Sequence, residues 1–391
     1  MARSPHVAGD GGSAEWIVRA RMRGLGLWSD STGATGATGG AVGDVVGRLA
    51  AVQAQEHPYA LWSVAQRLGA NHVTAGAASG QGPTASAMAR AFDDGEILRT
   101  HLLRPTWHVV AARDLRWMLR WSGPVVHAGN ARRYHELELD GRTLARAAEV
   151  IGEAVRGGPT TRRELAEVLE RKHIATDGQR LAYLVMYAEL HAVVCSGPMK
   201  GKQHTYAAVD ERAPADDGPV DRDHALAEVA RRYFATRGPA TLKDFGWWSG
   251  LKADDTRRAL DALRSLGAAG GELETRTVDG RTYYWSQAGR SRVESARARA
   301  WPRVDLVQCY DEVIISYTES RDAIATGGLS FAVPRHIDGF THVLLLDGRL
   351  LGHWRATAVV EVETRVGRAL DAGEEVALAD AVDRYRAFAS S

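Results

Sequence analysis

Two glutamines, Gln53 and Gln55, have the spacing in this sequence that most suggests chemistry. They interrupt an apolar helical pattern just before Pro58, and a proline disfavours helical geometry at the residue that precedes it. On a regular helix the two side chains would point about 200° apart. If the helix loosens near Pro58, both amides can face one cavity. An amide offers one carbonyl acceptor and two N–H donors, so it can hold and orient a water molecule without adding charge.

Two other interpretations of this segment remain open. The glutamines can be ordinary polar residues on the surface at the end of a helix. Glu56, the next residue, is a competing candidate because a carboxylate is a better general base than an amide.

The run Leu98–Val110 alternates polar and apolar residues for part of its length, which predicts two strands that turn at Arg104-Pro105. Its polar residues could contact phosphates or a base; they are His101, Arg104, Thr106 and His108. For both histidines, a buried structural role is the competing interpretation.

Basic residues cluster further along the chain and are candidates for phosphate contacts. They are Arg162, Arg163, Lys200 and Lys202. Several such residues in one arc the size of a duplex would form a phosphate track, whereas separately they would be ordinary solvated charges.

The cysteines, the Trp-Trp pair and the Tyr-Asp-Glu motif are expected to have structural roles, and metal binding is not expected. Spacings typical of metal ligands are absent from the sequence, so we expect neither a metal nor a cofactor. Cys195 and Cys309 are expected to be buried free thiols. The pair Trp247-Trp248 is expected in the core, and the charges of Tyr310-Asp311-Glu312 are expected to be paired, with a position at the border of a cleft left open.

An internal repeat organises the elements that must position these residues. Gly158-Pro159 and Gly238-Pro239 begin similar segments, each preceded by an amphipathic helix and followed by two more helices and a β-hairpin. Thr161 and Glu164 have the spacing of a capping box, and Asp279-Gly280 is a hairpin turn signal. Three helices and a hairpin predict a winged helix, a variant of the helix-turn-helix.

A third copy is predicted before these two, with helices near 15–25, 42–54, 59–68 and 84–93 and the hairpin of residues 97–111. After Pro302 the chain is rich in short β-runs, including 304–309, 313–317, 341–346, 349–356 and 358–365, followed by a helix at 378–389. We therefore expect an α+β fold, with three tandem winged-helix modules packed around a C-terminal β-barrel. The expected parts are a disordered tail (1–14), a first winged helix that carries Gln53 and Gln55 (15–125), a second (126–215), a third (216–300) and the barrel (301–391).

Composition narrows the class of protein. The chain has 391 residues, of which 45% are hydrophobic and 25% charged, as in a folded globular protein. The formal net charge of +1 shows no overall basic excess, so any surface for nucleic acid must be a local patch. The sequence shows no apolar run long enough to span a bilayer and no signal peptide, so we expect a cytoplasmic, nucleoid-associated protein with no membrane contact.

Five motifs in order resemble the AlkZ-like winged-helix DNA glycosylases, over nearly the whole chain from about Glu15 to Ala389. They are Gln53-Ala54-Gln55 before an Ala-Leu-Trp helix, Arg-Pro-Thr-Trp-His (104–108), the Gly-Pro segment with Trp-Trp-Ser-Gly-Leu (238–251), Tyr-Asp-Glu (310–312) and Gly-His-Trp-Arg (352–355). The resemblance implies three winged helices against a barrel and a catalytic glutamine-hydrophobic-glutamine element, carried here by Gln53 and Gln55. It also implies a β-hairpin that engages DNA, without indicating which hairpin does so here.

The activity that the resemblance implies is hydrolysis of the N-glycosidic bond of alkylated purines, including bulky adducts and interstrand crosslinks. The expected partner is double-stranded DNA that contains alkylated purines, bound by a monomer. We expect the glutamines to position water while Arg104 and other basic residues hold phosphates, and we expect the basic side chains of the first two modules to share one concave surface. The rival interpretations are a non-enzymatic winged-helix regulator, which would bind DNA without releasing a base, and a module for protein interactions, which would not bind DNA.

Overall fold

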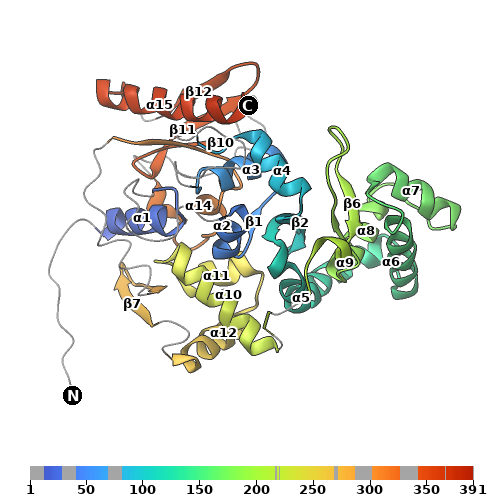
Figure 1. The fold of residues 1–391 in the computed structure, drawn as a ribbon. Helices are drawn as coiled ribbons and strands as arrows, with labels where there is room; N and C mark the ends of the chain where they lie inside the picture. Colours follow the sequence, from blue (N-terminus) through green and yellow to red (C-terminus); the bar gives the residue numbers. More distant parts are fainter. Residues whose placement is uncertain are drawn as a thin grey trace.

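The computed structural model describes residues 13–28, 41–68, 82–215, 218–219, 221–267, 272–286, 302–325, 342–365 and 367–390. Figure 1 shows a large body with a smaller lobe at its side, and the lobe contains α6, α7, α8 and β6. The expected disordered tail lies mostly outside the described residues, and α1 already begins at Ser13. We call the three successive groups of helices and a hairpin units 1, 2 and 3; their assignment as winged helices remains a prediction.

Unit 1 carries the glutamines. Its elements are α1 (Ser13–Gly24), α2 (Val42–Leu49), β1 (Val52–Gln53), α3 (His57–Ala65), α4 (Ala85–Asp93), β2 (Ile97–Leu102) and β3 (Thr106–Ala111). These strands form an antiparallel sheet in the order β1-β3-β2. The prediction of a helix through residue 54 was wrong, because Ala50 adopts a φ of 64° and the chain then pairs with β3, with Gln53 opposite His108.

Unit 2 is the lobe, reached through α5 (Leu115–Glu136). Its elements are α6 (Gly141–Val155), β4 (Thr160–Thr161), α7 (Arg162–Arg171), α8 (Arg180–Leu190), β5 (Val194–Ser196) and β6 (Thr205–Ala208), followed by the short α9 (Val209–Arg212). The predicted capping box of Thr161 and Glu164 is confirmed. The sheet order, β4-β6-β5, repeats that of unit 1.

Unit 3 has the same plan. Its elements are α10 (Arg222–Arg237), α11 (Leu242–Ser249), α12 (Ala253–Ser265), β7 (Leu273–Val278) and β8 (Arg281–Ser286). The predicted turn is confirmed, with positive φ at both Asp279 and Gly280. Ala240 bridges Tyr284 of β8, so the residues after Gly-Pro pair with the last hairpin strand, as β4 pairs with β6.

Comparison of the three units shows that unit 1 has a longer connection between its short strand and the helix that follows. In unit 2 the short strand ends at Thr161 and α7 begins at the next residue; in unit 3 only Thr241 separates Ala240 from α11. Both threonines cap the helix that follows them. In unit 1, Ala54, Gln55 and Glu56 lie between β1 and α3, which has no side-chain cap.

The described strands of the C-terminal part form one four-stranded sheet, and the expected barrel is not confirmed. Its elements are β9 (Val304–Val307), α14 (Glu312–Ile315), β10 (His342–Leu346), β11 (Arg349–Ala356), β12 (Val360–Thr364) and α15 (Ala372–Ala389). The order is β12-β11-β10-β9, and among the described strands the two edges do not pair. Helix α15 packs beside the edge strand β9, where Arg384 donates to the Val304 carbonyl at 2.8 Å. The predicted strand at 313–317 was wrong, because Asp311 accepts a hydrogen bond from the Val313 amide and starts the helix α14 instead.

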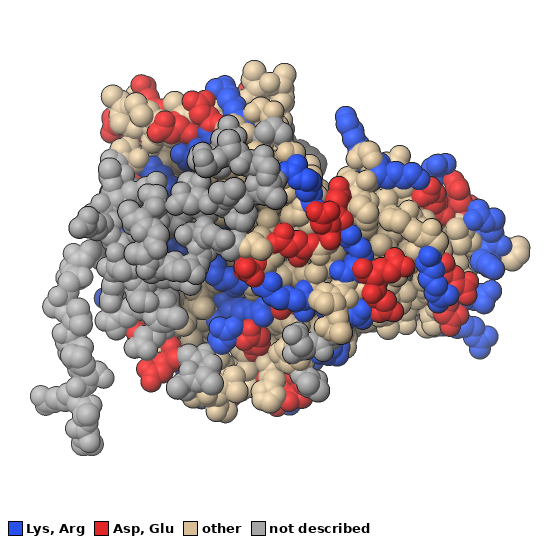
Figure 2. Space-filling model, in the orientation of Figure 1, with Lys and Arg blue, Asp and Glu red and all other residues tan. Residues whose placement is uncertain are grey.

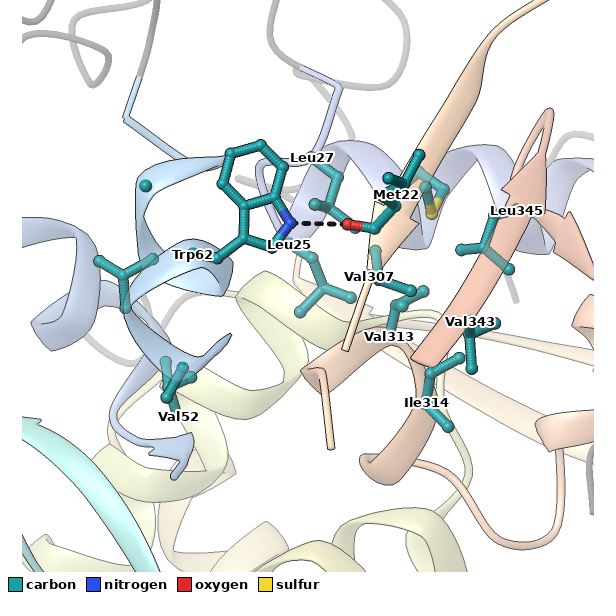
Figure 3. Packing of buried hydrophobic residues seen from close by; sticks show 14 of the residues in the cluster. Met22, Leu25, Leu27, Val52, Trp62, Val307, Val313, Ile314, Val343 and Leu345 are labelled. Atoms are coloured by element: carbon teal, nitrogen blue, oxygen red, sulfur yellow. Dashed lines mark hydrogen bonds between the residues drawn. The ribbon is translucent and has the colours of Figure 1, made fainter. Parts of the chain in front are cut away.

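Buried apolar residues form three clusters that join the units. The first cluster contains residues of the helices α1, α2, α3 and α4 and of the C-terminal sheet. The second contains residues of the β2–β3 hairpin, of α5 and of unit 3, and the third lies within unit 2. In the first, Trp62 donates its indole N–H to the Leu306 carbonyl at 2.8 Å (Figure 3). The segment with the glutamines is thus held between two cores. None of the helices described is long and apolar enough to cross a membrane.

Candidate active site: a glutamine pair beside a cleft

Both glutamines contact the turn of the β2–β3 hairpin. Arg104 Nη2 donates to Gln53 Oε1 at 2.8 Å, and the backbone N–H of Trp107 donates to Gln55 Oε1 at 2.7 Å. Residues two apart in an extended chain project to the same side. Gln53 is the last residue of the strand β1 and Gln55 lies two residues further along the chain, so this segment is extended and is not the loosened helix that we had expected.

These partners fix the orientation of both amides. A guanidinium and a backbone N–H can only donate, so each must face the amide oxygen. Each NH₂ group then points away from the turn, and neither has a hydrogen-bond partner in the described part of the chain. Each carbonyl keeps a second lone pair. Each amide can therefore donate to an oxygen atom through its NH₂ group and accept a further hydrogen bond at its carbonyl.

A buried ion pair holds the backbone of Gln53. Its N–H donates to Glu312 Oε1 at 3.0 Å, while Glu312 Oε2 lies 2.6 Å from Arg237 Nη2 and accepts from Trp248 Nε1 at 2.9 Å. Burial alone would raise the pKa of Glu312, but Arg237 and these hydrogen bonds outweigh it and the pKa is lowered. The Tyr-Asp-Glu motif thus acts as a support, as its paired charges predicted.

Glu56, the alternative base, faces another part of the molecule. Its carboxylate lies 3.6 Å from His342 Nε2, at the C-terminal sheet. Partial burial raises its pKa. No contact joins it to either glutamine amide among the described residues.

Unit 3 braces the hairpin turn. Leu103 is buried and has a φ of 61°, a strained value for leucine, and its carbonyl oxygen lies where a Cβ on Gly250 would clash. Gly250 itself has a φ of 73° at the end of α11. Next to it, Trp247 is 49% exposed and lies beside the Arg104 guanidinium, 5.6 Å from the ring centroid, which corrects the expectation that both tryptophans are core residues. Trp248 is fully buried.

The other predicted residues of the hairpin are inside the protein. His101 is buried and pairs with Glu189 of α8; His108 is fully buried and shares a hydrogen bond with the Thr106 carbonyl at 2.9 Å. Burial lowers the pKa of His108, so it is neutral. The hydroxyl of Thr106 is buried as well. The polar groups of these three side chains are buried in this structure, and contact between them and DNA stays a prediction.

A cleft of about 740 Å³ lies between units 1 and 2, and it brings Gln55 together with two of the predicted basic residues, Arg162 and Arg163. Its further lining residues are His57, Pro58, Arg99, Trp107, Thr161, Leu181, Gln203, His204 and Tyr206. Lys200 and Lys202 lie outside this lining, in the connection between β5 and β6, and Lys200 pairs with Glu164 at 3.1 Å. That hairpin projects from the lobe (Figure 1).

The basic residues are only partly gathered, contrary to the expectation of one basic concave surface. Figure 2 shows lysines and arginines interspersed with acidic residues over one face of the molecule. Arg67 of unit 1 is buried in an ion pair with Asp311, at 2.7 Å. Of the cleft residues, Arg99 was missed by the sequence reasoning; it stacks 4.1 Å from the centroid of Trp107. Its place among the alternating residues 98–110 was the available signal.

The histidines of the cleft are neutral. Burial, with His204 and Arg99 nearby, lowers the pKa of His57 to about 3, and burial with Arg99 lowers that of His204 to about 4. Within the described ranges, no group of three His, Cys, Asp or Glu side chains could hold a metal ion. The side chains that line the cleft are therefore mainly amides, aromatic rings and arginines, and none of them is a carboxylate.

Comparison with known proteins shows the family and the fold of the chain. The family model described as "DNA glycosylase AlkZ-like" matches residues 46–388, a range that includes both glutamines and the cleft. The chain belongs to this family. An AlkZ-like relative from Streptomyces sahachiroi, the "Interstrand DNA cross-link repair glycosylase", is 25% identical over 325 residues, covering 80% of this chain and 81% of the relative. The structure of Streptomyces sahachiroi DNA glycosylase AlkZ shares the fold, with a TM-score of 0.71, 19% identity and 96% of each chain covered.

Proposed function

We propose that this AlkZ-like protein is a DNA glycosylase that hydrolyses the N-glycosidic bond of N7-alkylated purines in double-stranded DNA. The observation that carries the proposal is the orientation of Gln53 and Gln55 by donor-only partners, which leaves two NH₂ groups and two carbonyl lone pairs for substrate and water. The relative named as an interstrand cross-link repair glycosylase supports including crosslinked purines among the lesions.

The chemistry suits uncharged catalytic groups. Alkylation at N7 puts a positive charge on the purine, so the base leaves without a strong acid. What remains is to place a water against the anomeric carbon and to stabilise the oxocarbenium-like sugar, which oriented amide dipoles can do. The carbonyl of Gln55 or Gln53 accepts a hydrogen bond from that water and so directs the water's oxygen lone pair at the anomeric carbon. As the C–O bond forms and the bond to the purine breaks, the neutral base leaves and the excess proton of the attacking water passes to solvent water.

Water is the nucleophile in this proposal, as in a monofunctional glycosylase. Covalent catalysis at the sugar would need an amine or a carboxylate, and the residues that line the cleft include neither a lysine nor an acidic residue. Lys200 and Lys202 lie in the β5–β6 connection, where we assign them, with Arg162 and Arg163, to the DNA backbone. Arg104, which we had expected to hold phosphates, instead orients Gln53.

The test measures release of N7-methylguanine from a defined duplex, with alkali treatment to reveal abasic sites. We expect the double variant Gln53→Ala/Gln55→Ala to release no N7-methylguanine while its affinity for the duplex stays within about twofold. The reason is that both residues are proposed to hold the water molecule and not to contact phosphates. Gln179→Ala, at an exposed glutamine of unit 2, is the matched control and should behave as the unmodified protein. Unchanged release by the double variant would refute the assignment, and binding without release by the unmodified protein would favour a non-enzymatic DNA-binding role.

A further inference from the structure

Trp247 presents a large aromatic ring to solvent next to the proposed catalytic glutamines. Of the Trp, Tyr and Phe side chains that the structure describes, only that of Trp247 is exposed, at 49%. A single exposed apolar residue is ordinary on a protein surface and indicates nothing by itself. Trp247 differs because three separate sets of contacts connect it to Gln53 and hold its ring in place.

The first connection is made by Arg104. Its guanidinium lies 5.6 Å from the centroid of the Trp247 ring, and its Nη1 donates to the Trp247 carbonyl at 3.4 Å. The Nη2 atom of the same group donates to Gln53 Oε1 at 2.8 Å. One guanidinium therefore lies between the exposed indole and the amide of Gln53.

The other two connections run through the short helix α14. Its first residue, Glu312, accepts a hydrogen bond from the Gln53 backbone N–H at 3.0 Å. The carbonyl of its last residue, Ile315, accepts from Trp247 Nε1 at 3.1 Å. Trp248, which follows Trp247 in α11, donates to Glu312 Oε2 at 2.9 Å. Because α14 has only four residues, the position of the indole relative to Gln53 is fixed over a short distance.

A fixed indole beside the glutamines suits a nucleobase. Every base has a flat π face that can stack on an aromatic side chain, and a ring that is already oriented loses little entropy when it does so. The other indole near the glutamines, that of Trp107, already has the Arg99 guanidinium 4.1 Å and the His101 ring 4.7 Å from its centroid. Trp247 is the ring with free surface.

We propose that Trp247 is a substrate-binding residue, on which the N7-alkylated purine stacks while Gln53 and Gln55 act at its sugar. The inference rests on the proposed function and deepens it. Unit 3 would then recognise the base, and unit 1 would supply the amides that hold water. Because the ring contacts the base and not the anomeric carbon, it should affect affinity for the lesion more than the rate of bond cleavage.

The first test measures binding without cleavage. Two duplexes carry a 2′-fluoroarabinose, a sugar that resists glycosidic cleavage, with either N7-methylguanine or guanine attached. We expect the unmodified protein to prefer the methylated duplex by about tenfold or more in fluorescence anisotropy, and Trp247→Leu to lower this preference about tenfold. Trp247→Phe keeps an aromatic face and should retain most of the preference.

Trp16→Leu is the matched control. Trp16 is a partly exposed indole of α1, and the guanidinium of Arg276 lies 5.6 Å from its ring centroid, as that of Arg104 does from Trp247. No contact joins Trp16 to either glutamine among the described residues. Trp16→Leu should therefore keep the preference within about twofold.

The second test separates stacking from support of the glutamines. In single-turnover release of N7-methylguanine from its natural sugar, Trp247→Leu should raise about tenfold the protein concentration that gives half the maximal rate. The maximal rate itself should stay within about threefold. A fall in the maximal rate alone would show that Trp247 supports Gln53 and does not bind the base.

The outcomes also distinguish this inference from the glycosylase assignment. If no base is released but the preference is present and is lost in Trp247→Leu, the glycosylase proposal fails and the stacking role stands. If the base is released but Trp247→Leu keeps the preference, or weakens both duplexes equally, the stacking proposal is overturned and the glycosylase proposal stands. Absence of any preference in the unmodified protein would also overturn the stacking proposal.

Discussion

Arg104 Nη2 donates to the side-chain carbonyl of Gln53 across 2.8 Å, and the same guanidinium lies beside the exposed ring of Trp247. Arg104 lies at the tip of a hairpin and carries a charge that could bind phosphate, but its guanidinium donates to a neutral amide instead. Burial lowers the pKa of Arg104, an effect that the Glu312 carboxylate opposes. The guanidinium stays charged, so this is a charge-assisted hydrogen bond that sets which end of Gln53 faces the substrate.

Replacing Arg104 should therefore reduce the rate more than the affinity. We expect Arg104→Met to lower the single-turnover rate of base release about tenfold, since a free amide can flip and present the wrong end. Arg104→Lys retains a donor and should recover part of the rate. Affinity for duplex, measured by fluorescence anisotropy, should change by less than about threefold. A large loss of affinity with an unchanged rate would instead make Arg104 a phosphate contact.

Gly250 offers a test of the bracing of the turn. Gly250→Ala should slow base release and destabilise the fold by about 1–3 kcal/mol, since it combines a backbone penalty at positive φ with a clash against the Leu103 carbonyl. Gly280→Ala is the matched control, because Gly280 has a φ of 76° but no neighbour in the way of a Cβ. Gly280→Ala should lower the free energy of unfolding only through the unfavourable positive φ, and its rate of base release should be that of the unmodified protein. Equal activity of the two variants would show that the turn is not braced by this contact.

The ion pair of Glu312 and Arg237 should matter for both folding and catalysis. Glu312→Gln leaves Arg237 buried without a counter-charge, which typically costs about 3–5 kcal/mol, and it weakens the hold on the Gln53 backbone. Asp311→Asn is the comparison: it damages the other buried pair, with Arg67, without contacting Gln53. At a temperature where both variants remain folded, we expect base release to fall further in Glu312→Gln.

The Glu312 carboxylate should also make the folded protein less stable at acidic pH. Because the pKa of Glu312 is lowered in the folded protein, its contribution is fully present above its ordinary value, near 4.5, and is lost as the pH falls below that. Urea denaturation of the unmodified protein should therefore show a falling midpoint below about pH 4.5. The Glu312→Gln variant should show a weaker dependence there, and an equal dependence would contradict the assignment.

His57 acts in a higher range of pH. Its pKa is lowered by burial to about 3, against 6.5 in an unfolded chain, so its contribution to stability is complete above pH 6.5 and declines as the pH falls from there. Between pH 7 and 5 the loss should be about 2 kcal/mol. His57→Phe should remove this part of the pH dependence in urea midpoints, whereas His135→Phe, at an exposed position of α5, should not.

The elements of units 2 and 3 could be predicted from the sequence, because local signals agreed there. The capping box at Thr161, the Asp279-Gly280 turn and the helical apolar spacing each act within a few residues. The strand β1 could not be predicted in this way. Val52 and Gln53 continue a helical apolar pattern, and only pairing with β3, about 55 residues later, draws them into a strand.

The candidate site was predictable in its residue types but not in its contacts. The glutamine spacing and the Arg-Pro-Thr-Trp-His motif identify the two segments that meet. Strand alternation in 98–110 could not show that Glu189 of α8 contacts His101, nor that His108 is fully buried, because burial depends on contacts with residues distant in the sequence. The same limitation hid Arg99, whose place in the cleft depends on the position of unit 2.

The three residues between β1 and α3 make the connection in unit 1 longer than the corresponding connections of units 2 and 3. Units 2 and 3 pass from the short strand to the next helix with at most one residue between them, and a threonine there caps the helix. Unit 1 gives up that cap and holds Gln55 in the longer connection, while its strand pairing and helix are kept. Of the two proposed catalytic glutamines, Gln55 thus occupies a position that units 2 and 3 lack, and a substitution there should leave the pairing of β1 and the helix α3 intact.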